Sequence, residues 1–166
     1  MAWAAALGAL LALAGAVLWR ARGLKRRHRA VLGAPLPPLD PGAQTLFASE
    51  SALHHGTRFA DGAAFLAWAP GVVDLSCTAQ ALFVGTLVVP LDFIEDVALV
   101  RDRAAMVDRE LPMLRVRWRR GGEALVTDLS LKGGMAQLER LRRELHLRQG
   151  GGDMAARLSR WLEAPP

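Results

Sequence analysis

The chain opens with an apolar run that a cluster of cations follows. Residues 1–19 carry no charged side chain. A helix of that length reaches about 28 Å, close to the ~30 Å hydrocarbon core of a bilayer. We therefore predict an uncleaved transmembrane anchor over residues 1–19. The side chains expected to hold it in the membrane are Trp3, Leu10, Leu11, Leu13 and Trp19.

The segment 20–33 is basic and should lie beside the membrane. A cleaved signal peptide carries its positive charge before the apolar run, whereas here the charge follows it. The positive-inside rule then puts the N-terminus outside and the rest of the chain in the cytoplasm, at the cell (inner or plasma) membrane. The cations are also predicted to contact anionic lipid, each contributing about 1 kcal/mol. They are Arg20, Arg22, Lys25, Arg26, Arg27 and Arg29.

Composition divides the remaining chain into three parts. Residues 34–43 contain four prolines and should form a stiff, extended linker. Residues 44–148 are predicted to form one domain with a single core. Residues 149–166 form a glycine-rich break and a short amphipathic tail.

Alternation of apolar and polar residues predicts antiparallel strands in the domain. It is clearest in Met113–Arg119, where Leu114, Val116 and Trp118 share one face, and Gly121-Gly122 then predicts a hairpin turn. The segment Gly62–Gly71 is apolar, and its type is left open. The other predicted strands are Ala52–Phe59, Val72–Thr78, Ala81–Val89, Val97–Arg101 and Ala124–Leu131, with a hairpin at Ala79-Gln80.

A helix should close the domain. Leu138, Leu141 and Leu145 recur at three- and four-residue spacing after Gly133-Gly134, which predicts an apolar stripe against the sheet. The fold class is therefore α+β, with an antiparallel sheet capped by a C-terminal helix and preceded by the transmembrane helix. We expect truncation at Gly133 to unfold the domain.

Two segments match short sequence motifs: Val89–Val97 is similar to "iPldxIxxV", and Leu114–Trp118 is similar to "lxvrW". Through these motifs the chain resembles bacterial pleckstrin-homology-like (PH-like) membrane domains. The layout also resembles small single-span actinobacterial PH-like proteins labelled "transporter", which have a "GTxxxxG" where this chain has Gly56–Gly62. The resemblance covers residues 52–147. It implies a PH-like barrel or sandwich, without an agreed biochemical function and without ligand residues.

The charge balance argues against nucleic acid as a partner. The chain has 21 basic and 16 acidic side chains, which gives +5, and residues 20–29 supply six of the basic ones. The rest of the chain therefore sums to −1, so the basicity is local rather than a property of the domain. The single cysteine, Cys77, excludes an internal disulfide and is expected to be a small core residue in a reducing compartment.

The remaining polar clusters do not predict an enzyme, a metal site or a cofactor. His54 and His55 should point to opposite faces of a strand, so we interpret them as solvated or core residues rather than ligands. The acids Glu95 and Asp96, with Asp92, are expected to cap a turn. No nucleophile is paired with a base, and no glycine loop precedes a lysine in the way phosphate binding requires.

The alternate face of Met113–Arg119 is the most interesting candidate site. Arg115, Arg117 and Arg119 share it, and three guanidinium groups can grip lipid headgroups or an acidic partner. The alternative is a solvated face paired with Glu123 and Asp128 of the neighbouring strand.

Three functions remain open from the sequence. The first is a membrane-anchored, non-enzymatic module that binds a membrane-protein partner or its own copy. The row Gly8, Ala12 and Ala16 would permit a homodimer of membrane helices. The second is a sensor of anionic lipid headgroups, and the third is an accessory subunit of a transporter or envelope complex.

Overall fold

The computed structural model describes residues 2–65, 67–104 and 109–146, without the side chains of residues 2–7, 9, 64 and 104. The predicted tail 149–166 lies outside this range. The chain divides into two compact units. One contains the N-terminal helix through Pro35 together with Arg120–Glu123. The other contains Leu36–Arg119 and the chain from Ala124 onward.

The first unit is built on one continuous helix, α1 (Ala2–Gly33), of 32 residues. The helix runs through both the predicted anchor and the predicted basic segment. The boundary near residue 19 is therefore a change of side-chain chemistry and not a break in the backbone. The helix ends shortly before Pro35, since a residue that precedes proline disfavours helical dihedral angles.

The proline-rich linker has no regular structure, as predicted. Residues 34–44 contain neither helix nor strand. The linker turns at Pro41-Gly42, where Gly42 N donates to Asp40 Oδ1 at 2.8 Å and Ala43 N donates to Asp40 O at 3.1 Å. The linker is also tied to the domain, because Asp40 N donates to Gln80 Oε1 at 2.7 Å.

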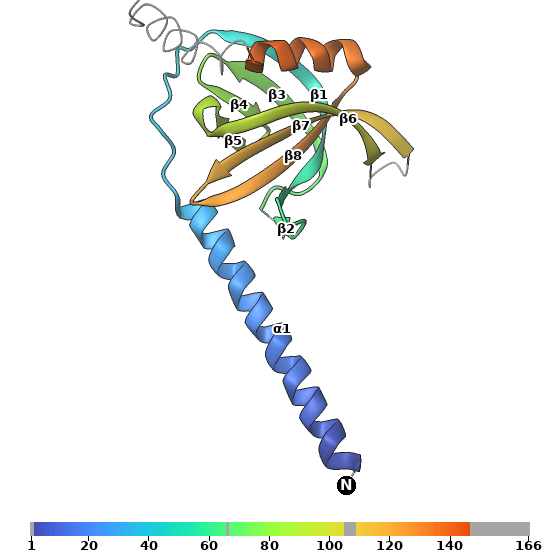
Figure 1. Ribbon diagram of the computed structural model, residues 1–166. Coiled ribbons are helices and arrows are strands. Elements are labelled where there is room, and N and C mark those ends of the chain that lie inside the picture. The colour runs from blue at the N-terminus through green and yellow to red at the C-terminus, as the bar shows by residue number, and fades with distance from the viewer. Residues whose placement is uncertain (1, 66, 105–108, 147–166) are drawn as a thin grey trace, which may run out of the picture. The chain divides into compact units, whose positions relative to one another are not determined.

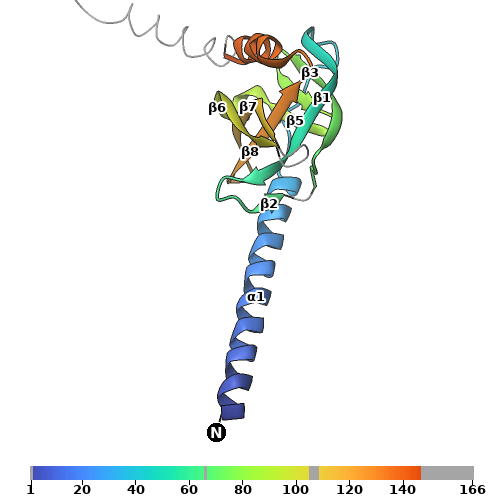
Figure 2. The ribbon, with the colours of Figure 1, turned by 90° about the vertical axis from the view of Figure 1, so that its right-hand side faces the viewer.

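The second unit is an antiparallel sheet with a helix at its C-terminal end, which confirms the predicted α+β class (Figures 1 and 2). Seven strands follow the order β5-β4-β3-β1-β8-β7-β6, and β2 pairs with β1 beside this path. The sheet thus joins β1 to β8, which are far apart in sequence. The strands are β1 (Thr45–Phe59), β2 (Ala64–Phe65), β3 (Gly71–Thr78), β4 (Ala81–Val84), β5 (Leu87–Pro90), β6 (Ile94–Ala104), β7 (Arg109–Arg120) and β8 (Glu123–Leu131).

Several predicted strand boundaries are wrong. The segment predicted as one strand, Ala81–Val89, is the hairpin β4–β5, because Gly85 takes a φ of 56° and its N–H donates to Asp74 O at 2.8 Å. Strand β1 begins at Thr45 rather than Ala52, and β6 extends the predicted Val97–Arg101 at both ends. The open segment Gly62–Gly71 contains the short strand β2, and its last residue, Gly71, begins β3.

The core lies between the inner face of the sheet and the C-terminal helix, which is described over residues 134–146. In both ribbon views this helix lies across one end of the sheet. Leu138, Leu141 and Leu145 are completely buried, as the spacing predicted, and so is Trp118 of β7. Burial of three leucines contributes roughly 5–8 kcal/mol before entropy is subtracted. Cys77 is also buried.

Candidate functional site

The arginine face of β7 exists as predicted. Leu114, Val116 and Trp118 are buried, whereas Arg117 and Arg119 on the alternate face are exposed and Arg115 is half-buried. The register with β6 places Arg117 opposite Asp96 and Arg115 opposite Ala98. The three arginines nevertheless have different surroundings.

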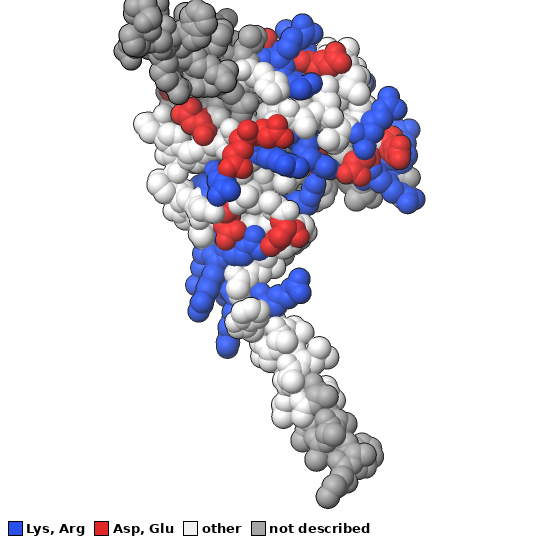
Figure 3. All heavy atoms as spheres, in the orientation of Figure 1, with Lys and Arg blue, Asp and Glu red and all other residues white. Residues whose placement is uncertain are grey.

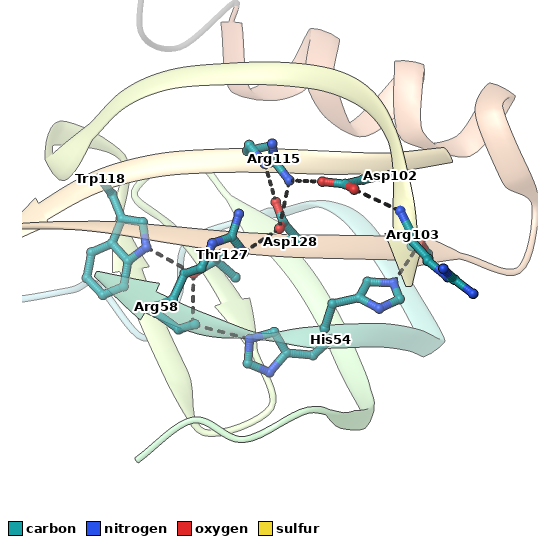
Figure 4. A network of polar contacts seen from close by, with 11 residues as sticks. His54, Arg58, Asp102, Arg103, Arg115, Trp118, Thr127 and Asp128 are labelled. Atoms are coloured by element: carbon teal, nitrogen blue, oxygen red, sulfur yellow. Dashed lines mark hydrogen bonds and ion pairs between the residues drawn. The ribbon is translucent and has the colours of Figure 1, made fainter. Parts of the chain in front are cut away.

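Arg115 is held by two carboxylates (Figure 4). Its Nε donates to Asp128 Oδ1 at 2.8 Å, and one terminal nitrogen donates to Asp128 Oδ2 at 3.2 Å and to Asp102 Oδ2 at 2.8 Å. The hydrogen bond to Asp128, and then that to Asp102, raise the pKa of Arg115 against the opposing effect of burial. The pKa of Asp102 is lowered, first by its hydrogen bond from Arg115 and then by the backbone N–H of Arg103. A headgroup would have to displace these carboxylates to bind Arg115.

Asp128 is the centre of this network. Its side chain is only 5% exposed, and it also accepts a hydrogen bond from Arg58 of β1 at 2.6 Å. The charge of this buried carboxylate in β8 is thus compensated by two guanidinium groups, one from β1 and one from β7, which lie on either side of β8. At Arg115 the structure therefore shows the alternative to a binding face, because this arginine is paired with Asp128 of the neighbouring strand.

The other two arginines, Arg117 and Arg119, are more exposed to solvent than Arg115. Arg119 forms an ion pair with Glu95, and both side chains are largely exposed, so this pair adds little stability. Arg117 makes no hydrogen bond or ion pair with the rest of the described chain. Glu95 and Asp96 lie in β6 rather than at a turn, so the prediction that they cap one is wrong.

A buried polar chain runs beneath the arginine face (Figure 4). Trp118 Nε1 donates to Thr127 Oγ1 at 3.0 Å, and Thr127 Oγ1 lies 2.9 Å from Thr57 Oγ1. His54 Nε2 lies 3.2 Å from Thr57 Oγ1 and completes the chain. All four residues are buried, so these hydrogen bonds satisfy groups that water does not reach.

His55 lies outside this chain and has a different partner. Ser130 Oγ donates to Pro112 O at 2.9 Å, so it must accept from His55 Nε2–H, also at 2.9 Å. The neutral ring then leaves Nδ1 as a buried acceptor with no hydrogen-bond partner. Burial is the largest cause that lowers the pKa of both His54 and His55. His54 is buried and His55 is half-buried, and each has a hydroxyl partner, which agrees with their interpretation as solvated or core residues.

Sequence reasoning missed an aromatic cluster beside His55. Phe65 stacks on Trp68 with ring centroids 4.8 Å apart, and Trp68 lies 5.8 Å from Trp118. Trp68 also lines a pocket of about 260 Å³ with Pro70. Phe65, Trp68 and Pro70 come from the segment 62–71, in which no periodicity indicated a common location.

The basic half of α1 belongs to the first unit and is mostly exposed (Figure 3). The exception is Arg27, which is half-buried and forms an ion pair with Glu123 at 2.8 Å. The expectation that Glu123 pairs with the arginines of β7 is therefore wrong. The five exposed cations are Arg20, Arg22, Lys25, Arg26 and Arg29.

A second contact of the first unit involves the turn 120–123. Arg120 donates to Ala34 O at 2.8 Å, and burial lowers the pKa of Arg120. Gly121, at a φ of 59°, lies so close to α1 that an added Cβ would stand 2.2 Å from Ala30 O. Only glycine fits at this position.

The predicted anchor residues are exposed where they are described. Leu10, Leu11 and Leu13 are each 66% exposed, and Trp19 is 79% exposed, whereas the side chain of Trp3 lies outside the description. In the part of the chain that the structure describes, no helix combines the length and apolar character needed to cross a membrane.

No metal site is evident among residues 2–65, 67–104 and 109–146, where no three His, Cys, Asp or Glu side chains come together. No protein-family model, curated protein or solved structure matches the chain.

Proposed function

We propose that this protein is a membrane-anchored, non-enzymatic PH-like module that binds a protein partner at the cytoplasmic face of the membrane. The observation that carries the proposal is the surface of α1. Its described apolar side chains, at residue 8 and residues 10–19, are exposed, and exposed cations begin at Arg20. This order is typical of a membrane helix with a cytoplasmic basic flank.

The exposed apolar area is large enough to matter energetically. Leu10, Leu11, Leu13, Val17 and Leu18 are each at least 57% exposed. Burial of one such side chain contributes about 1.5–3 kcal/mol, so five contribute roughly 8–15 kcal/mol before ordering costs. The uncharged sequence of residues 1–19, including side chains outside the description, supports a span.

The PH-like assignment is a proposal that the order of elements supports. Antiparallel strands followed by one helix agree with what the resemblance implies. The first motif, Val89–Val97, runs from β5 through a short 3-10 turn, Leu91–Phe93, into β6. The second, Leu114–Trp118, lies in β7 with its apolar positions buried. Both motifs thus lie in strands and a turn, which is expected for motifs that reflect packing and turn formation rather than ligand binding.

The arginine face favours protein binding over lipid sensing. Arg115 is engaged by Asp128 and Asp102, and Arg119 by Glu95, which leaves Arg117 as the arginine without a described partner. A headgroup site needs several uncompensated donors, whereas an interface tolerates paired charges at its rim. The partner is proposed to be a membrane protein or a second copy of this chain. The alternatives are an anionic-lipid sensor and a transporter or envelope subunit.

Membrane fractionation tests the anchor. Leu10→Asp combined with Leu13→Asp should move the protein from the carbonate-resistant membrane fraction to the soluble fraction, because two charges are placed in the span. Val72→Asp is the matched control, since Val72 is also an exposed apolar residue, 72% accessible, but lies in β3. Retention of the double variant in the membrane fraction would refute the anchor.

Salt dependence distinguishes protein binding from lipid sensing. Full-length protein is captured from gently solubilised membranes at low and high ionic strength, and its partners are identified by mass spectrometry. A stoichiometric partner that survives high salt supports the module, because an apolar interface is not screened. Recovery of the chain with anionic lipid alone, lost at high salt, would contradict it and favour headgroup sensing.

A further inference from the structure

A pocket of about 410 Å³ is lined by residues of the strands β1, β7 and β8 and of the start of the C-terminal helix. Its floor is mostly apolar and at least half-buried. Its rim is exposed and carries two cations, Arg109 of β7 and Lys132 after β8, together with the hydroxyl of Ser51. The floor residues that carry the argument are Leu53, Leu111, Pro112 and Leu131.

The two cations at this rim differ from the arginines elsewhere on the sheet. Arg58 forms an ion pair with Asp128, and Arg115 forms ion pairs with Asp128 and Asp102. In contrast, neither Arg109 nor Lys132 makes a hydrogen bond or an ion pair within the described chain, and no acidic side chain lines this pocket. Among the residues that the structure describes, two positive charges are thus uncompensated at the mouth of this apolar pocket.

We propose that this pocket binds a phosphate monoester. The guanidinium of Arg109 offers a planar fork that matches two phosphate oxygens, and the Lys132 ammonium adds a point charge. Ser51 supplies a hydroxyl donor at the rim. Ser130 in the floor supplies none, because its proton is donated to Pro112 O.

The apolar floor defines the rest of the ligand. It accommodates the organic group that carries the phosphate, so an aryl or alkyl phosphate should bind more tightly than inorganic phosphate. This inference goes beyond the proposed function, since it requires neither the anchor nor a protein partner.

Calorimetric titration of the full-length protein in a neutral detergent tests the site, with phenyl phosphate and inorganic phosphate as probes. Phenyl phosphate should bind with a Kd of about 1 mM or tighter. Arg109→Gln combined with Lys132→Gln should weaken it at least tenfold, because two charge-assisted hydrogen bonds are lost. The control is Arg101→Gln with Arg143→Gln, which removes two exposed charges outside the pocket.

The result expected is loss of binding in the pocket variant alone. Equal weakening in the control would show that net charge and not this site binds the probe. No effect of the pocket variant would show that the probe binds elsewhere, and either result would overturn the proposal. Absence of phenyl phosphate binding to the unmodified protein would also overturn the proposal. Melting temperatures of both variants should equal that of the parent, since all four side chains are exposed.

The phosphate has two possible sources, a soluble metabolite and a lipid headgroup. Micelles doped with phosphatidic acid carry a phosphate monoester, whereas micelles doped with phosphatidylglycerol carry a diester. If only phosphatidic acid displaces phenyl phosphate, the ligand is a lipid. If neither lipid displaces it, the ligand is a soluble phosphate monoester. Equal displacement by both lipids would contradict recognition of a monoester.

Discussion

Replacement of Asp128 by asparagine tests the network that organises the arginine face. The asparagine amide keeps the shape of the side chain but removes the charge that compensates Arg58 and Arg115. These two arginine side chains are 35% and 20% exposed, and Asp128 is 5% exposed. Removal of one partner from a buried ion pair costs about 3–5 kcal/mol. Because Arg58 is partly solvated, we expect Asp128→Asn to lower the free energy of unfolding by about 2–4 kcal/mol.

The assay is urea unfolding of the full-length protein in detergent, followed by tryptophan fluorescence. Trp118 is completely buried and donates a hydrogen bond to Thr127, the neighbour of Asp128 in β8. Its fluorescence emission should therefore report on the unfolding of the sheet. The matched control is Glu95→Gln, which removes the carboxylate partner of Arg119 on the same face. Both of those side chains are largely exposed, so the control should cost at most about 1 kcal/mol.

The two variants together can refute the reasoning. If Asp128→Asn costs no more than Glu95→Gln, the buried carboxylate does not organise the sheet. A double-mutant cycle with Arg115→Gln measures the pairwise energy directly. Coupling above about 0.5 kcal/mol supports the network, whereas additive effects would mean that Asp128 and Arg115 contribute independently.

Three further predictions concern the core, the turn of the first unit and pH. Leu141→Ala should lower the free energy of unfolding by about 2–5 kcal/mol in the same assay, and a smaller loss would mean that the helix is not part of the core. Gly121→Ala should lower the melting temperature more than Gly122→Ala does. Both glycines have positive φ, but an added Cβ clashes only at Gly121, and equal effects would contradict the close approach. Burial lowers the pKa of His54 and His55, so the unfolded chain binds more protons as the pH falls through about 6.5. Stability should therefore decrease from pH 7.5 to pH 5.5, and replacement of both histidines by Gln should flatten this slope in a series of unfolding measurements. An unchanged slope would exclude them as its source.

The candidate site was only partly predictable. Alternation in β7 indicated the arginine face. The hairpin predicted at Gly121-Gly122 placed Asp128 on the neighbouring strand, where it could pair with the arginines. The role of Arg58 could not be predicted, because β1 and β8 pair across about 70 residues of sequence. Glu123 illustrates the same point, since its partner, Arg27, lies 96 residues away.

The sequence alone determined what local periodicity can encode. The leucine stripe of the closing helix, the alternation of β7, the hairpin at Ala79-Gln80 and the irregular linker follow from side-chain spacing and turn residues. The change from apolar to basic chemistry near residue 19 is likewise a property of the sequence. Only the tertiary structure decided that one apolar run splits at Gly85 into β4 and β5, because the pattern is apolar on both sides of the turn.

Only the tertiary structure also decided which charges are compensated. Arg115 is paired, whereas Arg109 and Lys132 lie without a described partner at the rim of a pocket. The three have the same sign, and their sequence neighbours do not reveal which of them is paired. Their difference arises because ion pairs form across strands that meet only when the chain folds, and a sequence of charges does not specify which carboxylate each cation reaches.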